Sequence, residues 1–316
     1  MTPVAFRLLA RLADGALVSG SRLADEHGLA PSAVRVGIRQ LRRAGVPVEG
    51  VRGRGYRLCW PLPLLDDRRL EAALAGRGIR HEIRSQVTST NAELAARFGH
   101  RYALLAEYQT AGRGRRGRGW SSPPAAGLWL SFGYRFDLGL SGLGALALAA
   151  GLAAADALER AGVPVAMKWP NDLVAGGCKL GGVLVEGRGD RTGPCDVVVG
   201  VGINVRLPQT LPAPRQPWTD VHRLTGVTPD RDGLAAAVIV ALDRACARFA
   251  DRGLTPFLGR WRRLDALAGR EIEVAYARGK RLRGRADGIN RRGELRVRAA
   301  AGTVHVNAGE VRVRRA

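Results

Sequence analysis

The segment from Thr110 to Trp120 holds four arginines, four glycines and no acidic residue. It has no apolar periodicity, so it cannot bury one face as a helix or a strand does. Glycine lets the backbone approach a ligand closely and adopt positive φ, and guanidinium groups and backbone N–H groups bind anions. We therefore interpret this segment as a loop that binds an anion.

The same loop spells G-x-G-x-x-G from Gly112 to Gly117, which is also the pattern of a dinucleotide site. That pattern requires a helix that begins inside the motif and directs its N-terminus at the pyrophosphate. Here the chain continues through Trp120 into Pro123 and Pro124, which cannot continue a helix. The dinucleotide interpretation is therefore rejected.

Two lysines stand out because arginine supplies nearly all of the positive charge. Lys168 and Lys179 are two of the three lysines among 50 basic residues. An ammonium is a compact point charge and a guanidinium is a planar fork, so we infer that both positions require a lysine. The pattern predicts a hairpin, with a strand to Trp169, a Pro-Asn-Asp turn and a strand from Lys179, which would bring the two lysines close together.

Polar side chains lie where predicted strands end. Ser89, Thr90 and Asn91 precede a predicted helix at 92–98, and Asn204 ends an apolar strand at 197–203. A plain helix cap is the alternative for the first group. A basic loop, two lysines and strand-end amides can neutralise a reacting phosphate, and no nucleophile–His–Asp arrangement is present. The residues alone predict an enzyme that handles an anion or a phosphate.

The first sixty residues predict a winged helix-turn-helix, with helices at 6–12, 21–27 and 31–43 and two short strands at 46–51 and 56–58. Val34, Ile38 and Leu41 share one face of the third helix. On its other face and in the turn between the strands lie polar and basic residues that we expect to contact DNA: Ser32, Arg35, Arg39, Arg43, Arg52 and Arg54. The alternative is a helical module that binds protein.

Composition and spacing set the broader limits. The 316 residues predict three domains, at 1–62, 63–267 and 268–316, the last built from five short strands. Four scattered cysteines without a CxxC motif argue against disulfides and zinc and favour a reducing cytoplasm. No apolar run is long enough for a membrane span. The net charge of +22 fits nucleic-acid binding, but an arginine-rich coding bias spread over the surface explains it equally well.

With GRGRRGRGW, KWPNDL, CKLGGVLVE and GVGIN in this order, the chain resembles biotin protein ligases over essentially its whole length. The winged helix in front makes it similar to the bifunctional kind that also represses biotin-synthesis genes. The resemblance implies an α+β fold of three domains: a winged helix-turn-helix, a mixed α/β ligase domain like that of class II synthetases, and an SH3-like β-barrel that assists with ATP and the carrier protein.

The same resemblance implies the activity and the partners. Biotin and ATP would form biotinyl-5′-AMP, which serves both as the intermediate and as the corepressor, and biotin would pass to a lysine of a carboxylase's carrier domain. Mg²⁺ would be held through the ATP phosphates and not by a metal site of the protein. Operator DNA and a ligand-promoted homodimer, formed through sheet edges, are the other implied partners.

The resemblance also assigns roles to single residues. Catalysis is assigned to Lys179, Arg113 and Arg115. The implied biotin contacts are Ser89, Thr90, Asn91, Gln109, Arg113, Gly114, Arg115, Lys179, Gly182 and Leu184. The implied ATP and adenylate contacts are Arg116, Arg118, Trp120, Lys168, Asn171, Asp172, Lys179, Asn204 and Trp218.

One segment departs from the family pattern. The proline-rich stretch 207–217 resembles the family's adenylate-covering loop, but its prolines put the closing motion in question. For Trp218, which follows it, an ordinary packed aromatic is the alternative to an adenine contact.

Three other functions remain open from the sequence. The chain could be a ligase whose winged helix has no operator function. It could be a lipoate ligase, which shares the fold, although the GRGRRGRGW loop favours biotin. It could also be a transcription factor that senses a small anion without catalysis, against which Lys179 and the intact KWPND motif argue.

Overall fold

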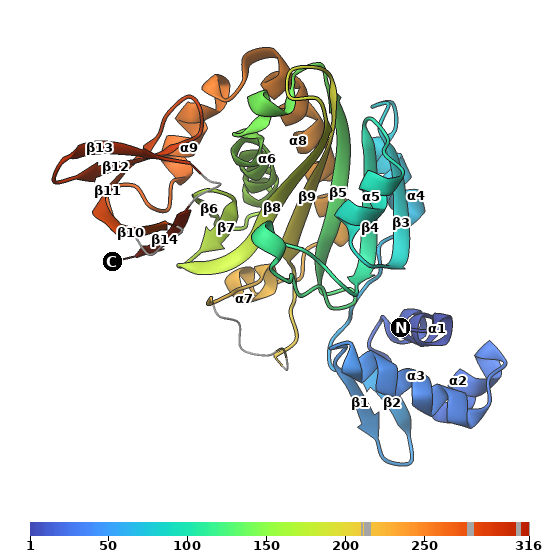
Figure 1. Cartoon of the computed structure of the whole chain (residues 1–316). Coiled ribbons are helices and arrows are strands. Elements are labelled where there is room, and N and C mark those ends of the chain that lie inside the picture. The colour runs from blue at the N-terminus through green and yellow to red at the C-terminus, as the bar shows by residue number, and fades with distance from the viewer. Residues whose placement is uncertain (210, 212–215, 277–280, 308–310, 316) are drawn as a thin grey trace.

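The computed structural model describes residues 1–209, 211, 216–276, 281–307 and 311–315. In this part of the chain the strands form a two-stranded, a seven-stranded and a five-stranded sheet, one after another along the sequence (Figure 1). The three sheets follow the predicted order of domains, and the α+β fold class is confirmed.

The N-terminal domain contains α1 (Pro3–Leu12), α2 (Gly20–His27), α3 (Pro31–Arg43), β1 (Val48–Val51) and β2 (Gly55–Leu58). The side chains of Thr2 and Ser19 cap the first two helices, and Pro31 begins the third. β1 and β2 pair as an antiparallel wing. The predicted order of three helices and a wing is confirmed.

The central sheet carries the mixed α/β domain. Its strand order is β3-β4-β5-β9-β8-β7-β6, and every pair is antiparallel except β3 with β4. The strands are β3 (Arg80–Val87), β4 (Tyr102–Gln109), β5 (Gly127–Phe136), β6 (Ala166–Lys168), β7 (Asp172–Ala175), β8 (Cys178–Gly189) and β9 (Cys195–Asn204).

Helices cover the two faces of this sheet unequally. On one face α4 (Asp67–Leu74), α6 (Leu146–Arg160) and α8 (Arg231–Arg252) bury an apolar core that includes Val183 and Ile203. On the other face α5 (Thr90–Ala96) places Leu94 against Leu104 and Val198. The second face is therefore left largely to loops. The shorter helices are η1 (Arg115–Gly117), η2 (Leu140–Leu143), α7 (Val221–Thr225), η3 (Thr255–Phe257) and α9 (Leu258–Leu264).

The predicted lysine hairpin is wrong in one respect, because the structure contains two hairpins in place of one. β6 turns at Pro170 and Asn171 into β7, and β7 turns at Gly176 and Gly177, both with positive φ, into β8. The short strand β7 forms because Leu173, Val174 and Ala175 are apolar enough to be buried. Its first residue, Asp172, is the cross-strand partner of Lys168.

The C-terminal sheet has the order β13-β12-β11-β10-β14 and is antiparallel throughout. Its strands are β10 (Glu271–Tyr276), β11 (Arg281–Ile289), β12 (Leu295–Ala299), β13 (Gly302–Val306) and β14 (Val311–Arg315). The turn at Gly293 packs against the ligase domain, where its carbonyl accepts a hydrogen bond of 2.9 Å from Trp169 Nε1. This contact ties the small sheet to the KWPND motif.

A buried ion pair joins residues 63–65, which lead out of the N-terminal domain, to the ligase domain. Arg231 of α8 and Glu107 of β4 approach to 2.7 Å with only 2% and 4% of their side chains exposed. Glu107 also accepts a hydrogen bond from the Leu65 amide, and Arg231 donates to the carbonyls of Pro63 and Gly127. A buried charge is tolerated when its remaining hydrogen bonds are satisfied, as they are here.

We predict that Arg231→Met destabilises the protein by about 3–5 kcal/mol, because it leaves the Glu107 carboxylate buried without a partner. The matched control lies on the same helix: Arg252→Met removes an ion pair to Asp251 whose side chains are 70% and 69% exposed, which should cost less than about 1 kcal/mol. Urea unfolding of both variants measures the difference. Equal midpoints would contradict the role given to the buried pair.

Candidate functional site

One row of residues crosses the loop-covered face of the central sheet. Lys168, Asp172, Gly182, Gly202 and Trp129 are successive cross-strand partners from β6 to β5. Directly paired residues project from the same face of a sheet. The row therefore places a cation and a carboxylate at one side of a strip whose middle carries no side chain.

The indole of Trp120 lies over this glycine strip. A methyl group at Gly202 would come within 2.8 Å of the Trp120 ring, so only glycine leaves room for it. The ammonium of Lys179 lies 5.2 Å from the centroid of the same ring and 2.6 Å from Asp172 Oδ1. Among the described residues, Trp120 Nε1 is buried without a hydrogen-bond partner. The structure thus gathers Lys179, Asp172 and an unused N–H donor at one place.

The arginine–glycine loop closes on itself above the strip. The backbones of Arg113 and Gly119 pair as an isolated antiparallel β-bridge. Gly114 N donates to Arg118 O at 2.7 Å, and Trp120 N donates to Gly112 O at 2.8 Å. The tip is the single turn η1, in which Arg116 has a φ of 58°. These bonds make the loop a narrow hairpin.

Arg115 is the arginine that the loop turns inward. Its side chain is half-buried, and Nη1 lies 3.4 Å from Asn171 Oδ1. Burial lowers the pKa of the Arg115 guanidinium from its usual value, and the nearby Arg116 adds to this effect. A desolvated cation gains strongly from an anionic partner. Arg113, by contrast, is exposed, as are Arg116 and Arg118, so the catalytic role of Arg113 stays a prediction.

Gln109 fixes the start of the loop to α5. Its Oε1 accepts from the Thr90 amide at 2.8 Å, and its Nε2 donates to Ser122 Oγ at 2.8 Å. Ser89 occupies the N-cap position of α5, as the alternative of a plain helix cap expects, but its side chain makes no capping hydrogen bond. Ser89, Thr90 and Gln109 are all buried beside the site.

Ser89, Thr90, Asn91 and Gln109 form a polar wall beside the site, and Asn91 lies at its other end. Its Oδ1 accepts from Ser131 Oγ at 2.6 Å, and its Nδ2 donates to Glu186 Oε2 at 2.7 Å. Its Nδ2 also lies 3.4 Å from the carbonyl of Leu184, whose side chain projects from the same face as Gly182. The predicted group from Ser89 to Asn91 is thus brought together with Gln109, Gly182 and Leu184.

Lys179 and Asn204 hold the segment around Trp218. Lys179 N donates to Pro217 O at 2.8 Å, Thr219 N donates to Lys179 O at 2.9 Å, and Asn204 Nδ2 donates to Thr219 O at 2.9 Å. Trp218 therefore lies beside Lys179. Of the predicted covering loop at 207–217, Thr210 and residues 212–215 lie outside the described residues.

The N-terminal domain touches the ends of both loops around the site. A methyl group at Gly45 would lie 3.4 Å from Pro123 Cβ and 3.7 Å from Pro208 Cγ. The Arg206 guanidinium stacks 4.7 Å above the Trp60 ring. The domain that carries α3 therefore packs where each loop joins the sheet.

Several site residues were missed in the sequence. Ser122, Ser131 and Glu186 complete the hydrogen bonds of Gln109 and Asn91. Gly200 lies under Asn91, and Gly202 lies under Trp120. Two glycines that alternate along an apolar strand indicate one bare face. That spacing could have identified Gly200 and Gly202, whereas nothing in the sequence distinguishes the serines.

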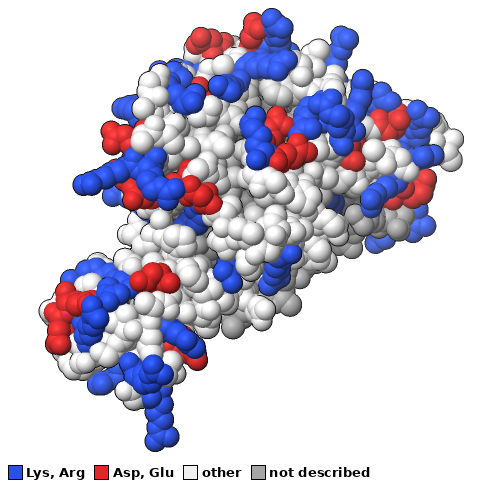
Figure 2. Space-filling view, turned by 180° about the vertical axis from the view of Figure 1, so that it is seen from behind, with Lys and Arg blue, Asp and Glu red and all other residues white. Residues whose placement is uncertain are grey.

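The predicted DNA-facing residues are all exposed. Ser32, Arg35, Arg39 and Arg43 lie on α3, and Arg52 and Arg54 lie in the wing turn. The α3 sequence contains no acidic residue, and Val36 is 42% exposed on it. Elsewhere Figure 2 shows basic and acidic side chains mixed over one face of the protein, as a broadly distributed charge predicts.

Two other kinds of feature are absent from the part of the chain that the structure describes. No group of three or more His, Cys, Asp or Glu side chains is placed to hold a metal ion. No described helix is both long enough and apolar enough to cross a membrane.

Comparisons with known proteins match all three parts of the chain. Residues 83–204 match the Biotin/lipoate A/B protein ligase family, residues 5–57 an HTH domain and residues 268–314 the biotin protein ligase C terminal domain. The Bifunctional ligase/repressor BirA of Salmonella typhimurium is 37% identical over 93% of this chain and 92% of its own length. The Biotin--[acetyl-CoA-carboxylase] ligase of Mycobacterium tuberculosis is 36% identical over 79% and 96%. The structure of biotin protein ligase from Aquifex aeolicus in complex with biotin and ATP has a TM-score of 0.65 and 27% identity, over 75% of this chain and 99% of that one.

We predict that Gly200→Ala displaces α5, because the added methyl would lie 2.3 Å from Asn91 Oδ1, which Ser131 and Glu186 hold in place. Overpacking of this kind costs about 1–3 kcal/mol. Amide hydrogen exchange of α5 measures the loosening. The control, Gly144→Ala, has nothing within 4 Å of its new methyl. Unchanged exchange in Gly200→Ala would contradict the proposed tightness of the wall.

Proposed function

The chain belongs to the biotin protein ligase family, and we propose that the site described above joins biotin to ATP and then transfers biotin to a lysine of a carrier domain. The enzyme is an ATP-dependent biotin ligase with a helix-turn-helix domain in front, as in its bifunctional ligase/repressor relatives. The observation that carries the proposed mechanism is the position of Lys179, beside Asp172 and Trp120 and near a loop with a half-buried arginine.

The first step must bring two anions together. A biotin carboxylate oxygen bonds to the α-phosphorus of ATP, the bond from that phosphorus to the pyrophosphate oxygen breaks, and biotinyl-5′-AMP and pyrophosphate result. Lys179 is held by a single carboxylate at 2.6 Å. Lys179 can exchange Asp172 for the biotin carboxylate and then for the α-phosphate. Its positive charge lowers the repulsion between these two anions and stabilises the negative charge of the transition state.

The second step needs little beyond positioning. The carrier lysine's amine attacks the biotinyl carbonyl carbon, AMP departs with the bonding pair, and the amine loses a proton to solvent. Arg115, desolvated and beside Asn171, would hold the adenylate phosphate until the carrier arrives. Closure of the loop over the mixed anhydride limits its hydrolysis.

The residues present fit a Mg²⁺ ion that is carried mainly by ATP. With no cluster of three acidic, histidine or cysteine side chains in the described chain, Asp172 is the nearby carboxylate that could add a ligand. Mg²⁺, when bound, neutralises the phosphate oxygens and the departing pyrophosphate. Release of Asp172 from Lys179 would free its carboxylate for this purpose.

Binding roles are proposed for the two halves of the site. Biotin would lie against the wall formed by Ser89, Thr90, Asn91 and Gln109, over Gly182 and Leu184, with Arg113, Gly114 and Arg115 above it. ATP and adenylate would lie toward the KWPND hairpin and Trp218, with the remaining groups Arg116, Arg118, Trp120, Lys168, Asn171, Asp172 and Asn204. Support comes from Arg223, which stacks 3.9 Å above Trp218 and leaves that ring fixed beside Lys179.

We also propose a ligand-promoted homodimer through an open sheet edge. β7 pairs with β8 only up to Gly182, and Asn171 still bonds both backbone groups of Val183 on that side, so residues 184–189 of β8 pair with β9 and with no second strand. An unpaired edge of this kind accepts a strand from another chain. A second copy or the carrier domain could use it. The boundaries near 62 and 267 and the cytoplasmic location stay predictions.

The alternatives differ in what they leave unexplained. A lipoate ligase shares the matched family, but the Mycobacterium tuberculosis relative at 36% identity is named a biotin--[acetyl-CoA-carboxylase] ligase. An anion sensor without catalysis does not explain a lysine poised between a carboxylate and an indole. A ligase without operator function leaves the exposed basic residues of α3 without a role.

We predict that Lys179→Gln lowers biotin-dependent ATP–pyrophosphate exchange by about 100-fold or more, since it removes the cation that meets both reacting anions. Arg262→Gln, an exposed position on α9, serves as the control and should exchange at the wild-type rate. Wild-type exchange in Lys179→Gln would remove this lysine from the mechanism.

A separate prediction concerns DNA. Arg35→Ala with Arg39→Ala should abolish a gel shift on DNA upstream of biotin-synthesis genes and leave pyrophosphate exchange intact, because both residues are exposed on α3, in the domain that precedes the ligase domain. Arg7→Ala, exposed on α1, is the control. Each lost phosphate contact should also reduce the salt dependence of binding by about one unit of slope. A gel shift that is independent of α3 would show that the winged helix does not read the operator.

A further inference from the structure

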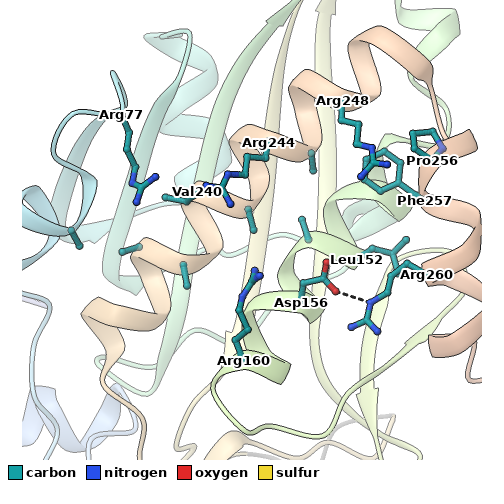
Figure 3. Close-up of a pocket in the computed structure, with 16 residues that line it drawn as sticks. Arg77, Leu152, Asp156, Arg160, Val240, Arg244, Arg248, Pro256, Phe257 and Arg260 are labelled. Atoms are coloured by element: carbon teal, nitrogen blue, oxygen red, sulfur yellow. Dashed lines mark hydrogen bonds and ion pairs between the residues drawn. The ribbon is translucent and has the colours of Figure 1, made fainter.

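A second concavity lies on the helix-covered face of the ligase domain, on the other side of the sheet from the ligand site. Its volume is about 560 Å³, and it is bounded by α6, α8, η3 and the beginnings of α9 and of the segment after α4 (Figure 3). Cavities of 300–1,000 Å³ commonly hold small molecules. The established activity makes no use of this groove.

The floor of the groove is apolar and made of small side chains. Leu152 and Ala153 come from α6, and Ala237, Val240 and Ala241 come from α8. The short side chains leave a trough above the contact between the two helices. Such a floor offers an aliphatic chain shelter from water, at about 25 cal/mol for each Å² of apolar surface buried.

The rim of the groove is strongly cationic. Arg77, Arg160, Arg244, Arg248 and Arg260 line it, together with a single acidic residue, Asp156. Figure 3 shows that Arg160 and Arg244 come from the two facing helices.

Nearby acidic residues neutralise only part of this rim. Asp156, at 2.7 Å, and Glu159 both pair with Arg260, and Asp243 is paired with Arg101 at 2.7 Å. Within the described chain no ion pair satisfies Arg77, Arg160 or Arg244. Guanidinium groups in such an arrangement bind carboxylates and phosphates through paired N–H donors.

We propose that this groove binds an aliphatic anion, namely an unbranched hydrocarbon chain that ends in a carboxylate or a phosphate. The apolar floor takes the chain, and Arg160 and Arg244 take the head group. A nucleotide fits less well, because base recognition uses an open aromatic face, and the Arg248 guanidinium already covers Phe257 at 5.7 Å. An inorganic anion alone would leave the apolar floor exposed to water.

The experiment uses the full chain and isothermal titration calorimetry. The probes are dodecanoate and dodecyl phosphate as monomers. Dodecyltrimethylammonium, which keeps the chain and reverses the charge, is the control for charge. Inorganic phosphate, which lacks the chain, is the control for the hydrocarbon. Both aliphatic anions should bind with one site per chain, in the presence or absence of biotin and ATP, and neither control should bind.

Variants test the location. Arg160→Glu with Arg244→Glu should weaken dodecanoate binding at least 10-fold, whereas Arg262→Glu with Arg263→Glu changes the net charge equally on the exposed part of α9 and should have no effect. Ala241→Phe, which fills the floor, is a second test that does not depend on charge. Circular dichroism and pyrophosphate exchange verify that each variant is folded.

Four results would overturn the proposal: no binding of either aliphatic anion, equal binding of the cationic amphiphile, equal loss in the two charge-reversed pairs, or binding only to phosphatidylglycerol vesicles and not to monomeric anion. The last result would assign the arginines to a membrane surface in place of a small-molecule groove.

Discussion

The reaction of this enzyme depends on overcoming the repulsion between a carboxylate and a triphosphate. In water each anion is stabilised by its own hydration shell, and at close range in a protein the repulsion grows as water is excluded. In the proposed mechanism the chain meets this constraint by placing cations where the two anions would meet. Lys179 is held ready by Asp172, and Arg115 is already partly desolvated. The glycines in the strip leave room for the Trp120 ring over Gly202 and for Lys179 beside Gly182.

The rest of the fold keeps these few groups in register. Strand pairing sets Lys168, Asp172 and the glycines in one row, and Gln109 and Asn91 tie α5 to the sheet through buried hydrogen bonds. The buried ion pair between Arg231 of α8 and Glu107 of β4 joins residues 63–65 to the ligase domain. The turn at Gly293 of the C-terminal sheet accepts a hydrogen bond from Trp169 of the KWPND motif. Gly45 of the DNA-binding domain lies close to Pro123 and Pro208, at the ends of the two loops around the ligand site.

Much of this organisation could be predicted from the sequence because its strongest signals are local. Periodicity and capping residues identified the helices of the winged domain. The arginine–glycine loop and the two rare lysines indicated the region where the structure gathers Lys179, Asp172 and Trp120. What failed required knowledge of pairing in space. The short strand β7 was taken as part of a turn, Ser131 and Glu186 became site residues only through cross-strand neighbours, and the difference between Arg113 and Arg115 arises from how the loop folds back. The arginine-rimmed groove is formed by helices distant in the sequence and leaves no motif.

Intact-mass spectrometry tests this account most directly. The purified chain is incubated with ATP, Mg²⁺, a carboxylase carrier domain and either biotin or lipoate. The account predicts that a single biotin is added to one lysine of the carrier, that lipoate is not transferred, and that omission of ATP abolishes the reaction. Transfer of lipoate in place of biotin, or no transfer under these conditions, would contradict it.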